Sequence, residues 1–337
     1  MKISVRALTV VAAVVFAATT VAGQKVNPKA NVKAVGFPPP YWAYPANAPD
    51  YAAPPDDGVP RTVPNSNVKL TLTTIREVTT PPDWHQEDHP AMPPVVGNAP
   101  KSQVWACGYC HLPVGWGKPE NANVANLPEA YFMQQVADYK SGKRRSSIPD
   151  IVPHSGMLEA VTNTSDAEIH KAWEYFSKNK LTTQRYKVTE AAMVPKSKVQ
   201  GGWVLYPIVG PGAGTEPIGK RIIEMPVDPG LVTLRDWRQT FVTYVPPGSL
   251  KRGEELVTTG GNGRTQKCTI CHGEDLRGIG PFPPIAGRSA IYTFRQLYDF
   301  KSGTRAGDWS PLMKDVVAKL TLDDMIAITA YTSSQMP

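Results

Sequence analysis

All four cysteines of this 337-residue chain belong to two copies of one short motif. The motif reads Cys-Gly-Tyr-Cys-His at 107–111 and Cys-Thr-Ile-Cys-His at 268–272. Cys-x-x-Cys-His is the attachment signature of c-type haem: both thiols form thioether bonds to the haem and the histidine binds its iron. The sequence therefore predicts two covalently attached haem c groups, held by Cys107, Cys110, His111, Cys268, Cys271 and His272.

Three other uses of such cysteines explain the pattern less well. A zinc site requires the two pairs to meet across 161 residues, whereas structural zinc sites gather their ligands over shorter stretches. A redox dithiol needs only one pair and no adjacent histidine. Two disulfides suit an exported chain, but cysteines three residues apart form a strained bridge. Haem attachment accounts for all four cysteines and both adjacent histidines at once.

The first 23 residues have the pattern of a secretory signal peptide. Lys2 and Arg6 form a positive start, Leu8–Ala18 is apolar, and Val21–Gly23 supplies small residues before a cut near Gly23. The apolar run is short for a membrane span, and no other stretch is long and apolar enough. We expect an exported, periplasmic protein with no transmembrane span in the mature chain. This compartment suits covalent haem, which is attached on the far side of the membrane.

The charge of the chain gives a weak indication of its partners. The formal net charge is +7, and without Lys2 and Arg6 it becomes +5. Haem propionates offset much of this excess, which is spread along the sequence. We therefore expect no nucleic-acid partner and interpret the basic charge as surface charge that steers a redox partner protein.

An internal repeat relates the two motifs. Residues 131–144 match residues 292–305 at an offset of 161, the same offset that separates the two haem motifs. Each segment has apolar residues at helical spacing and ends at a glycine, which predicts a middle helix in each module. A further helix is predicted after the capping sequences Ser165–Glu168 and Thr321–Asp324.

The repeat also nominates the second iron ligands. Met157 lies eight residues before Ser165, and Met313 lies eight residues before Thr321. Thioether sulfur is a known partner of histidine on cytochrome c iron and raises its reduction potential. We predict Met157 and Met313 as the distal ligands. His154 competes with Met157, although it aligns with Ser310.

Other methionines follow the commoner use of this residue in core packing. Met325 aligns with Ile169 inside the last helix, and Met133 aligns with Phe294. Neither is therefore expected to bind iron.

These features resemble class I cytochrome c domains: an early haem motif, a middle helix, a methionine loop and a C-terminal helix. The resemblance covers about 101–180 and 249–337, named here module 1 and module 2. It implies a backbone carbonyl that orients each proximal histidine, in a turn at Gly280-Pro281 of module 2 and near Pro119 of module 1. The tandem arrangement resembles periplasmic dihaem electron carriers.

The resemblance implies a mainly α fold: two class I cytochrome c-like helical domains joined by a strand-bearing segment, with an extended proline-rich arm. The arm is residues 24–100, where Val68–Val78 suggests one strand. The inter-module segment is residues 181–248. Its predicted strands are Trp203–Val209, Arg221–Met225 and Phe241–Val245.

Several side chains admit two interpretations. Arg144 and Arg305 either pair with haem propionates or lie on exposed helix ends. A metal site at His85–His89 is disfavoured because the order is not His-Glu-x-x-His and prolines confine any helix there. We expect aromatic packing against the haem edge from Trp105, Trp116 and Trp309.

Two six-coordinate haems leave no open iron position, so the leading hypothesis is a carrier of single electrons between partner proteins, with no catalytic residues. A dihaem peroxidase with a displaceable Met157 is one alternative. A cytochrome subunit of a dehydrogenase or oxidase complex is another, and it shares the same haem chemistry.

Overall fold

A computed structural model describes residues 39–48, 50–100, 105–148, 151–201 and 203–337. The predicted signal peptide and the start of the arm, up to residue 38, lie outside these residues. The fold is mainly helical, with 37% helix and 11% strand, which confirms the predicted class.

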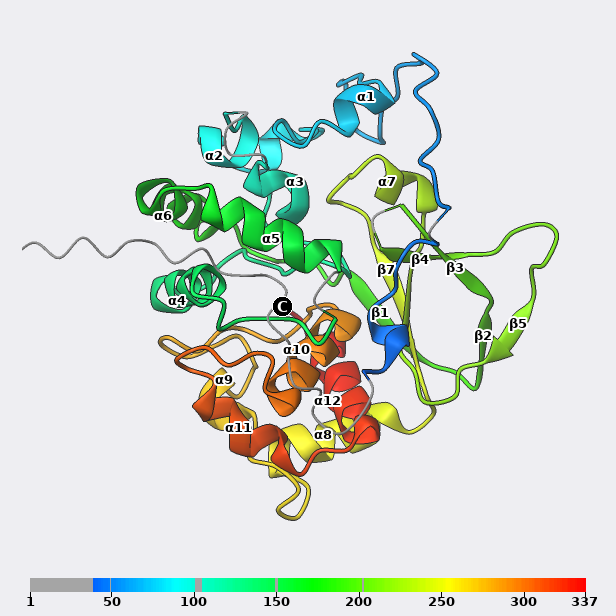
Figure 1. Ribbon diagram of the computed structural model, residues 1–337. Coiled ribbons are helices and arrows are strands. Elements are labelled where there is room, and N and C mark those ends of the chain that lie inside the picture. The colour runs from blue at the N-terminus through cyan, green and yellow to red at the C-terminus, as the bar shows by residue number, and fades with distance from the viewer. Residues whose placement is uncertain (1–38, 49, 101–104, 149–150, 202) are drawn as a thin grey trace, which may run out of the picture. The chain divides into compact units, whose positions relative to one another are not determined.

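Each module is a set of helices that includes its haem motif (Figure 1). The helices of module 1 are α3 (Cys107–His111), α4 (Glu129–Lys140), α5 (Val152–Thr162) and α6 (Asp166–Phe176). Those of module 2 are α8 (Ser249–Thr259), α9 (Thr269–His272), α10 (Ala290–Ser302), α11 (Pro311–Ala318) and α12 (Leu322–Ser334).

The predicted middle helices are confirmed as α4 and α10. The predicted last helices are confirmed as α6 and α12, and each begins with a complete capping box. Ser165 Oγ accepts from the Glu168 amide and Thr321 Oγ1 from the Asp324 amide, so local chemistry sets both starts.

The two modules differ in what packs against the last helix. In module 2, α8 crosses α12 so closely that a Cβ built on Gly253 lies 2.0 Å from the Ala327 carbonyl oxygen. In module 1, the arm supplies this packing through α2 (Pro94–Gly97), whose Val95 and Val96 are buried in one cluster with Phe176. The core of module 1 therefore includes part of the arm.

The inter-module segment contains all seven strands that the described residues form. A three-stranded sheet has the order β1-β7-β6, with β1 parallel and β6 antiparallel to β7. Two antiparallel pairs, β2 with β5 and β3 with β4, accompany it.

The elements of this segment are β1 (Tyr186–Glu190), β2 (Met193–Pro195), β3 (Ser197–Gln200), β4 (Val204–Pro207), β5 (Thr215–Pro217), β6 (Ile223–Pro226), α7 (Pro229–Thr233) and β7 (Phe241–Val245). The three predicted strands are confirmed as β4, β6 and β7.

A buried carboxylate attaches this sheet to module 2. Glu224 on β6 accepts hydrogen bonds from Ser289 Oγ at 2.5 Å and from the Ala290 amide at 2.7 Å, at the start of α10. Thr243 Oγ1 donates to the same side chain at 3.1 Å. Burial raises the pKa of Glu224. The sheet and the middle helix of module 2 are thus joined at a helix N-terminus, where a carboxylate is stabilised.

The predicted strand at 68–78 is wrong. Leu70 forms a single β-bridge with Arg61, and the chain then turns into the short helix α1 (Leu72–Ile75) behind its N-cap Thr71. In the described part of the arm, the other regular elements besides α2 are two 3₁₀ turns, η1 (Tyr41–Ala43) and η2 (Gln86–Asp88). The alternating pattern did not produce a strand, because the apolar side chains of this stretch pack into a core shared with other segments.

That core joins the arm to the other segments. Trp84 of the arm is 2% exposed and packs in one cluster with Leu112 and Val114 of module 1 and Trp237 of the inter-module segment. The Trp84 indole donates to the Leu234 carbonyl at 2.8 Å.

The α8–α12 crossing predicts opposite effects for two glycine substitutions. Gly253→Ala should destabilise the protein by about 1–3 kcal/mol, because the new methyl group overlaps backbone of α12. Gly156→Ala in α5, whose Cβ meets Trp105 at 3.9 Å, should stabilise by up to about 1 kcal/mol. Urea unfolding of the haem-loaded protein measures both, and an equal effect of the two changes would contradict the tight crossing.

Candidate haem-binding site

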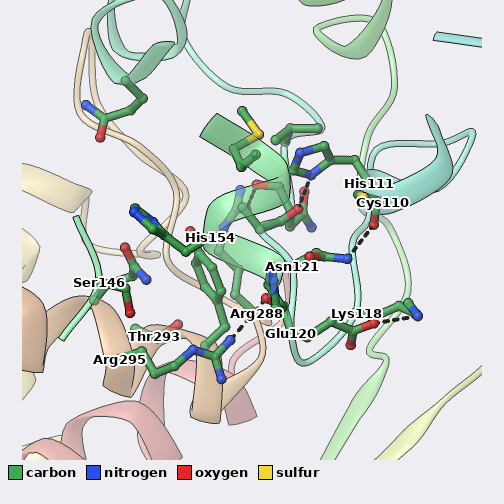
Figure 2. Close-up of a pocket in the computed structure, with 18 of the residues that line it drawn as sticks. Cys110, His111, Lys118, Glu120, Asn121, Ser146, His154, Arg288, Thr293 and Arg295 are labelled. Carbon is green, nitrogen blue, oxygen red and sulfur yellow. Dashed lines mark hydrogen bonds and ion pairs between the residues drawn. The ribbon is translucent and has the colours of Figure 1, made fainter. Parts of the chain in front are cut away.

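The predicted haem ligands of both modules line one cavity of about 1090 Å³. This volume lies above the usual range of roughly 300–1,000 Å³ for a single small-molecule site. Figure 2 shows Cys110, His111, His154, Arg288 and Arg295 around it. The predicted residues that line it are Cys107, Cys110, His111, Met157, Cys268, Cys271, His272 and Met313. Size and donor set both fit two covalent haems.

Both proximal histidines have one ring nitrogen fixed by a backbone carbonyl. His111 Nδ1 lies 2.8 Å from the Ala122 oxygen, and His272 Nδ1 lies 2.7 Å from the Pro283 oxygen. Since a carbonyl only accepts, each Nδ1 carries the proton and each Nε2 is left with a free lone pair for iron. Burial lowers the pKa of both rings, which keeps them neutral.

The carbonyls differ from those expected by resemblance. The oxygen that orients His272 belongs to Pro283 rather than to the Gly280-Pro281 turn. In module 1 the partner of His111 is Ala122, while the Pro119 oxygen accepts from Arg295 Nη2 at 2.7 Å. Ala122 and Pro283 are related by the offset of 161, so extending the repeat would have found both.

The two methionines lie on helices rather than in loops. Met157 is in the middle of α5 and packs against a cluster that contains Val161 and Ile169. Met313 is near the start of α11, against the core of module 2. His154 lines the cavity one turn before Met157, and burial lowers its pKa to about 4. Iron ligation by either side chain stays a prediction.

The two methionines that were predicted to pack in the core, Met325 and Met133, do so. Met325 is 0% exposed in the core of module 2, and Met133 packs beside Val136.

The cysteines do not have the character of redox thiols. All four are free thiols in the structure. Burial raises the pKa of Cys107 to about 12 and that of Cys268 to about 11. A redox dithiol requires a lowered thiol pKa, so this environment argues against that alternative.

A symmetric hydrogen-bond network joins the modules beside the cavity. Arg144 Nη2 donates to Tyr292 Oη at 3.1 Å and to Gln296 at 3.1 Å. Arg305 Nη2 makes the reciprocal contacts, to Tyr131 Oη at 2.9 Å and to Gln135 at 2.6 Å.

The partners of this network are related by the repeat. Each arginine also donates through Nη1 to the glutamine of its own module, and the two arginines form an antiparallel β-bridge. Arg144 and Arg305 are 8% and 7% exposed, so the exposed helix-end interpretation is wrong. We name Tyr131, Gln135, Arg144, Tyr292, Gln296 and Arg305 the cross-module network.

A buried carboxylate supports the same contact. Asp299 on α10 accepts from the Ser147 amide at 2.9 Å and from Ser147 Oγ at 2.6 Å. Tyr44 of the arm donates to it at 3.0 Å. Burial raises the pKa of Asp299. One side chain of module 2 thus contacts both module 1 and the arm.

Arginines from other segments bind the loop of module 1 that orients His111. Arg185 Nη1 donates to the carbonyls of Trp116 and Gly117, at 3.2 and 3.0 Å. Arg288 Nη1 donates to the Asn123 carbonyl at 2.8 Å. Sequence reasoning missed these residues because no periodic signal links them to a loop 65 or more residues away.

The three tryptophans divide into two groups. Trp105 and Trp309 line the cavity, as expected for packing at the haem edge. Trp116 does not line it; its indole donates instead to the Lys180 carbonyl at 3.2 Å.

The histidines of the arm lie beside protein carboxylates. His85 Nε2 lies 3.2 Å from Asp236, and His89 Nε2 lies 3.1 Å from Asp83. Across the residues that the structure describes, no three metal-binding side chains converge. The disfavoured metal interpretation of His85–His89 gains no support.

Comparisons with known proteins match the chain to cytochromes. The cytochrome c family profile matches residues 250–335. Cytochrome c-554(548) of Halomonas halodenitrificans is 34% identical over 89 residues, which are 26% of this chain and 98% of that protein. Cytochrome c4 of Pseudomonas aeruginosa is 27% identical over 246 residues, 70% of this chain and 87% of that protein.

A third relative is the thiosulfate dehydrogenase electron acceptor of Stutzerimonas stutzeri, 39% identical over 88 residues. The match spans 25% of this chain and 39% of that protein, which is well under two thirds of its length. The chain belongs to the cytochrome c family. It is a c-type cytochrome, a class of electron carriers that bind haem covalently.

The helices of the described part of the chain include none that is long and apolar enough to cross a membrane.

The cross-module network predicts matched effects in the two modules. Tyr131→Phe and Tyr292→Phe should each destabilise the protein by about 1 kcal/mol, because each removes one hydrogen bond to a buried guanidinium. Tyr244→Phe on β7 is the control. Urea unfolding of the haem-loaded proteins measures all three, and losses no larger than that of the control would contradict the network.

Proposed function

We propose that this chain is an exported dihaem cytochrome c that passes single electrons between partner proteins through two His/Met-ligated haems. The observation that carries the proposal is the shared cavity: both Cys-x-x-Cys-His motifs and both nominated methionines line it. The bound haems supply the one-electron iron couple, and the chain supplies their ligands and surroundings.

The geometry suits electron transfer without substrate chemistry. The fixed Nδ1 protons of His111 and His272 leave each Nε2 free to bind iron on one side. Met157 and Met313 would supply thioether sulfur as the second ligands, which would raise the reduction potential. With two protein ligands for each iron, the sites would have no open position for a substrate.

The cavity also has a cationic group suited to haem propionates. Arg288 lines the cavity, and its Nε is buried with no hydrogen-bond partner. Burial lowers the pKa of Arg288 to about 10, which marks a cation that lacks a neutralising partner. A propionate beside it relieves that cost, since guanidinium and carboxylate are matched in geometry. Arg144 and Arg305 line the cavity too and are further propionate contacts in this proposal.

Two further features concern partners and compartment. The likeness to a protein named as an electron acceptor of thiosulfate dehydrogenase favours a dehydrogenase as the electron donor, either as a soluble partner or as a subunit of one complex. We propose the periplasm as the compartment because haem attachment by Cys-x-x-Cys-His occurs there. A dihaem peroxidase remains the second function, and it requires displacement of Met157.

The test is a haem count together with ligand variants of the recombinant holoprotein. We expect two haems per chain and the weak red absorption of Met-ligated ferric haem. Met157→His and Met313→His should each halve that absorption and lower one of the two potentials. His154→Gln and Met133→Leu are the controls and should change neither signal.

Two outcomes would contradict the proposal. One haem per chain would remove the dihaem assignment, and loss of half the red absorption in His154→Gln would transfer the distal position to His154. Cyanide binding or peroxide turnover by the unmodified protein would favour the peroxidase.

A further inference from the structure

Arg235 of the inter-module segment reaches into the haem motif of module 1. Its guanidinium lies over the Tyr109 ring at 3.7 Å from the centroid, and Nη2 donates to the Tyr109 carbonyl. Tyr109 stands between the two haem-binding cysteines of module 1, and both it and Arg235 line the cavity. The contact joins residues 126 apart in sequence.

The backbone at Arg235 is held in an uncommon conformation to make this contact. Its φ is +60°, in the left-handed region that non-glycine residues rarely adopt. The Arg235 amide donates to the Val232 carbonyl at 3.1 Å, at the end of α7. Such strain persists where the surroundings impose it, and it often marks functional positions.

The charge of Arg235 is not neutralised by an ion pair among the described residues. The neighbouring carboxylate of Asp236 lies 3.2 Å from His85 Nε2 instead. Arg235 Nε is buried without a hydrogen-bond partner. The other cation near this motif, Lys118, is paired with Glu120 at 2.5 Å (Figure 2). Arg235 therefore adds a net positive charge beside the first haem motif.

Module 2 has no equivalent of this contact. The repeat relates Tyr109 to Ile270, whose side chain is 64% exposed. In the described part of the chain, no arginine donates a hydrogen bond to the Ile270 carbonyl. The second motif has a cation of its own, Lys267, which directly precedes Cys268 and lines the cavity. The two motifs differ in the cation that contacts the motif itself, which is Arg235 in module 1.

We propose that Arg235 raises the potential of the first haem above that of the second, so that an electron entering at the second haem settles on the first. This inference rests on the proposed dihaem function. A nearby cation favours ferrous over ferric iron, because ferrous iron carries one positive charge fewer. In the step, ferrous iron in module 2 loses one electron and ferric iron in module 1 gains it, with no proton or further reactant.

The experiment is a spectroelectrochemical titration of the unmodified holoprotein and four variants. Arg235→Gln removes the charge and keeps a donor, whereas Arg235→Lys keeps the charge and loses the planar stack. Arg221→Gln is the control, since Arg221 lies in the same segment, outside the cavity lining, and pairs with Glu216 at 3.1 Å. Met157→His identifies the step of the first haem, because it lowers that step.

We expect the step of the first haem to be the upper one in the unmodified protein. Arg235→Gln should shift the electron-sharing equilibrium between the haems about tenfold toward the second haem, which is about 59 mV for one electron. The lower step should not move, and Arg235→Lys should keep most of the upper potential. Arg221→Gln should change neither step.

Several results would overturn the inference. One is an unchanged upper step in Arg235→Gln. Another is a loss of upper potential in Arg235→Lys equal to that in Arg235→Gln, which indicates a structural role alone. The third is assignment of the lower step to the first haem. The haem count and the red ferric absorption of each variant are measured in parallel. Fewer than two haems per chain, or no red ferric absorption, in the unmodified protein would instead refute the dihaem function on which the inference rests.

Discussion

The reciprocal contact between Arg144 and Arg305 determines how the two modules meet. The two guanidinium groups are buried and share Gln135 as an acceptor, and neither is paired with a carboxylate side chain of the described residues. Burying a charge is costly unless its donors are satisfied, and here tyrosine and glutamine oxygens from both modules satisfy them. Because each arginine has acceptors in the opposite module, separating the modules would break hydrogen bonds to both guanidinium groups.

The rest of the molecule compensates for an incomplete first module. Module 2 has its own pair of crossing helices, α8 and α12, and is the part that matches the family profile. Module 1 takes Val95 and Val96 from the arm and receives Arg185 from the inter-module segment behind its histidine loop. The added segments are therefore structural components of module 1 and of its candidate haem site. They also make its surroundings differ from those of the second.

Sequence patterns predicted the parts of the site that depend on local chemistry. Features that depend on residues a few positions apart were predictable from the sequence. They are the haem motifs, the middle helices, the capping boxes at Ser165 and Thr321, and three strands. Nomination of the two methionines came from comparing the modules with each other.

The parts that could not be predicted depend on long-range contacts. Arg235 and Arg185 of the inter-module segment donate hydrogen bonds to backbone carbonyls of module 1. No periodic sequence pattern predicts contacts between residues so far apart in the chain. The predicted strand at 68–78 failed because Leu72 and Ile75 enter a core shared with Trp237, so tertiary packing overruled alternation. The repeat relates the carbonyls of Ala122 and Pro283, so comparing the modules could have predicted both. The family resemblance indicated the nearby proline turns instead.

The central claim is that each iron has one histidine and one methionine ligand, in two equivalent modules. Proton NMR of the fully reduced holoprotein tests it most directly, because the haem ring current shifts the methyl protons of an axial methionine far upfield. The account predicts two such three-proton resonances, one lost in Met157→His and the other in Met313→His. One resonance, or none, in the unmodified protein would contradict it.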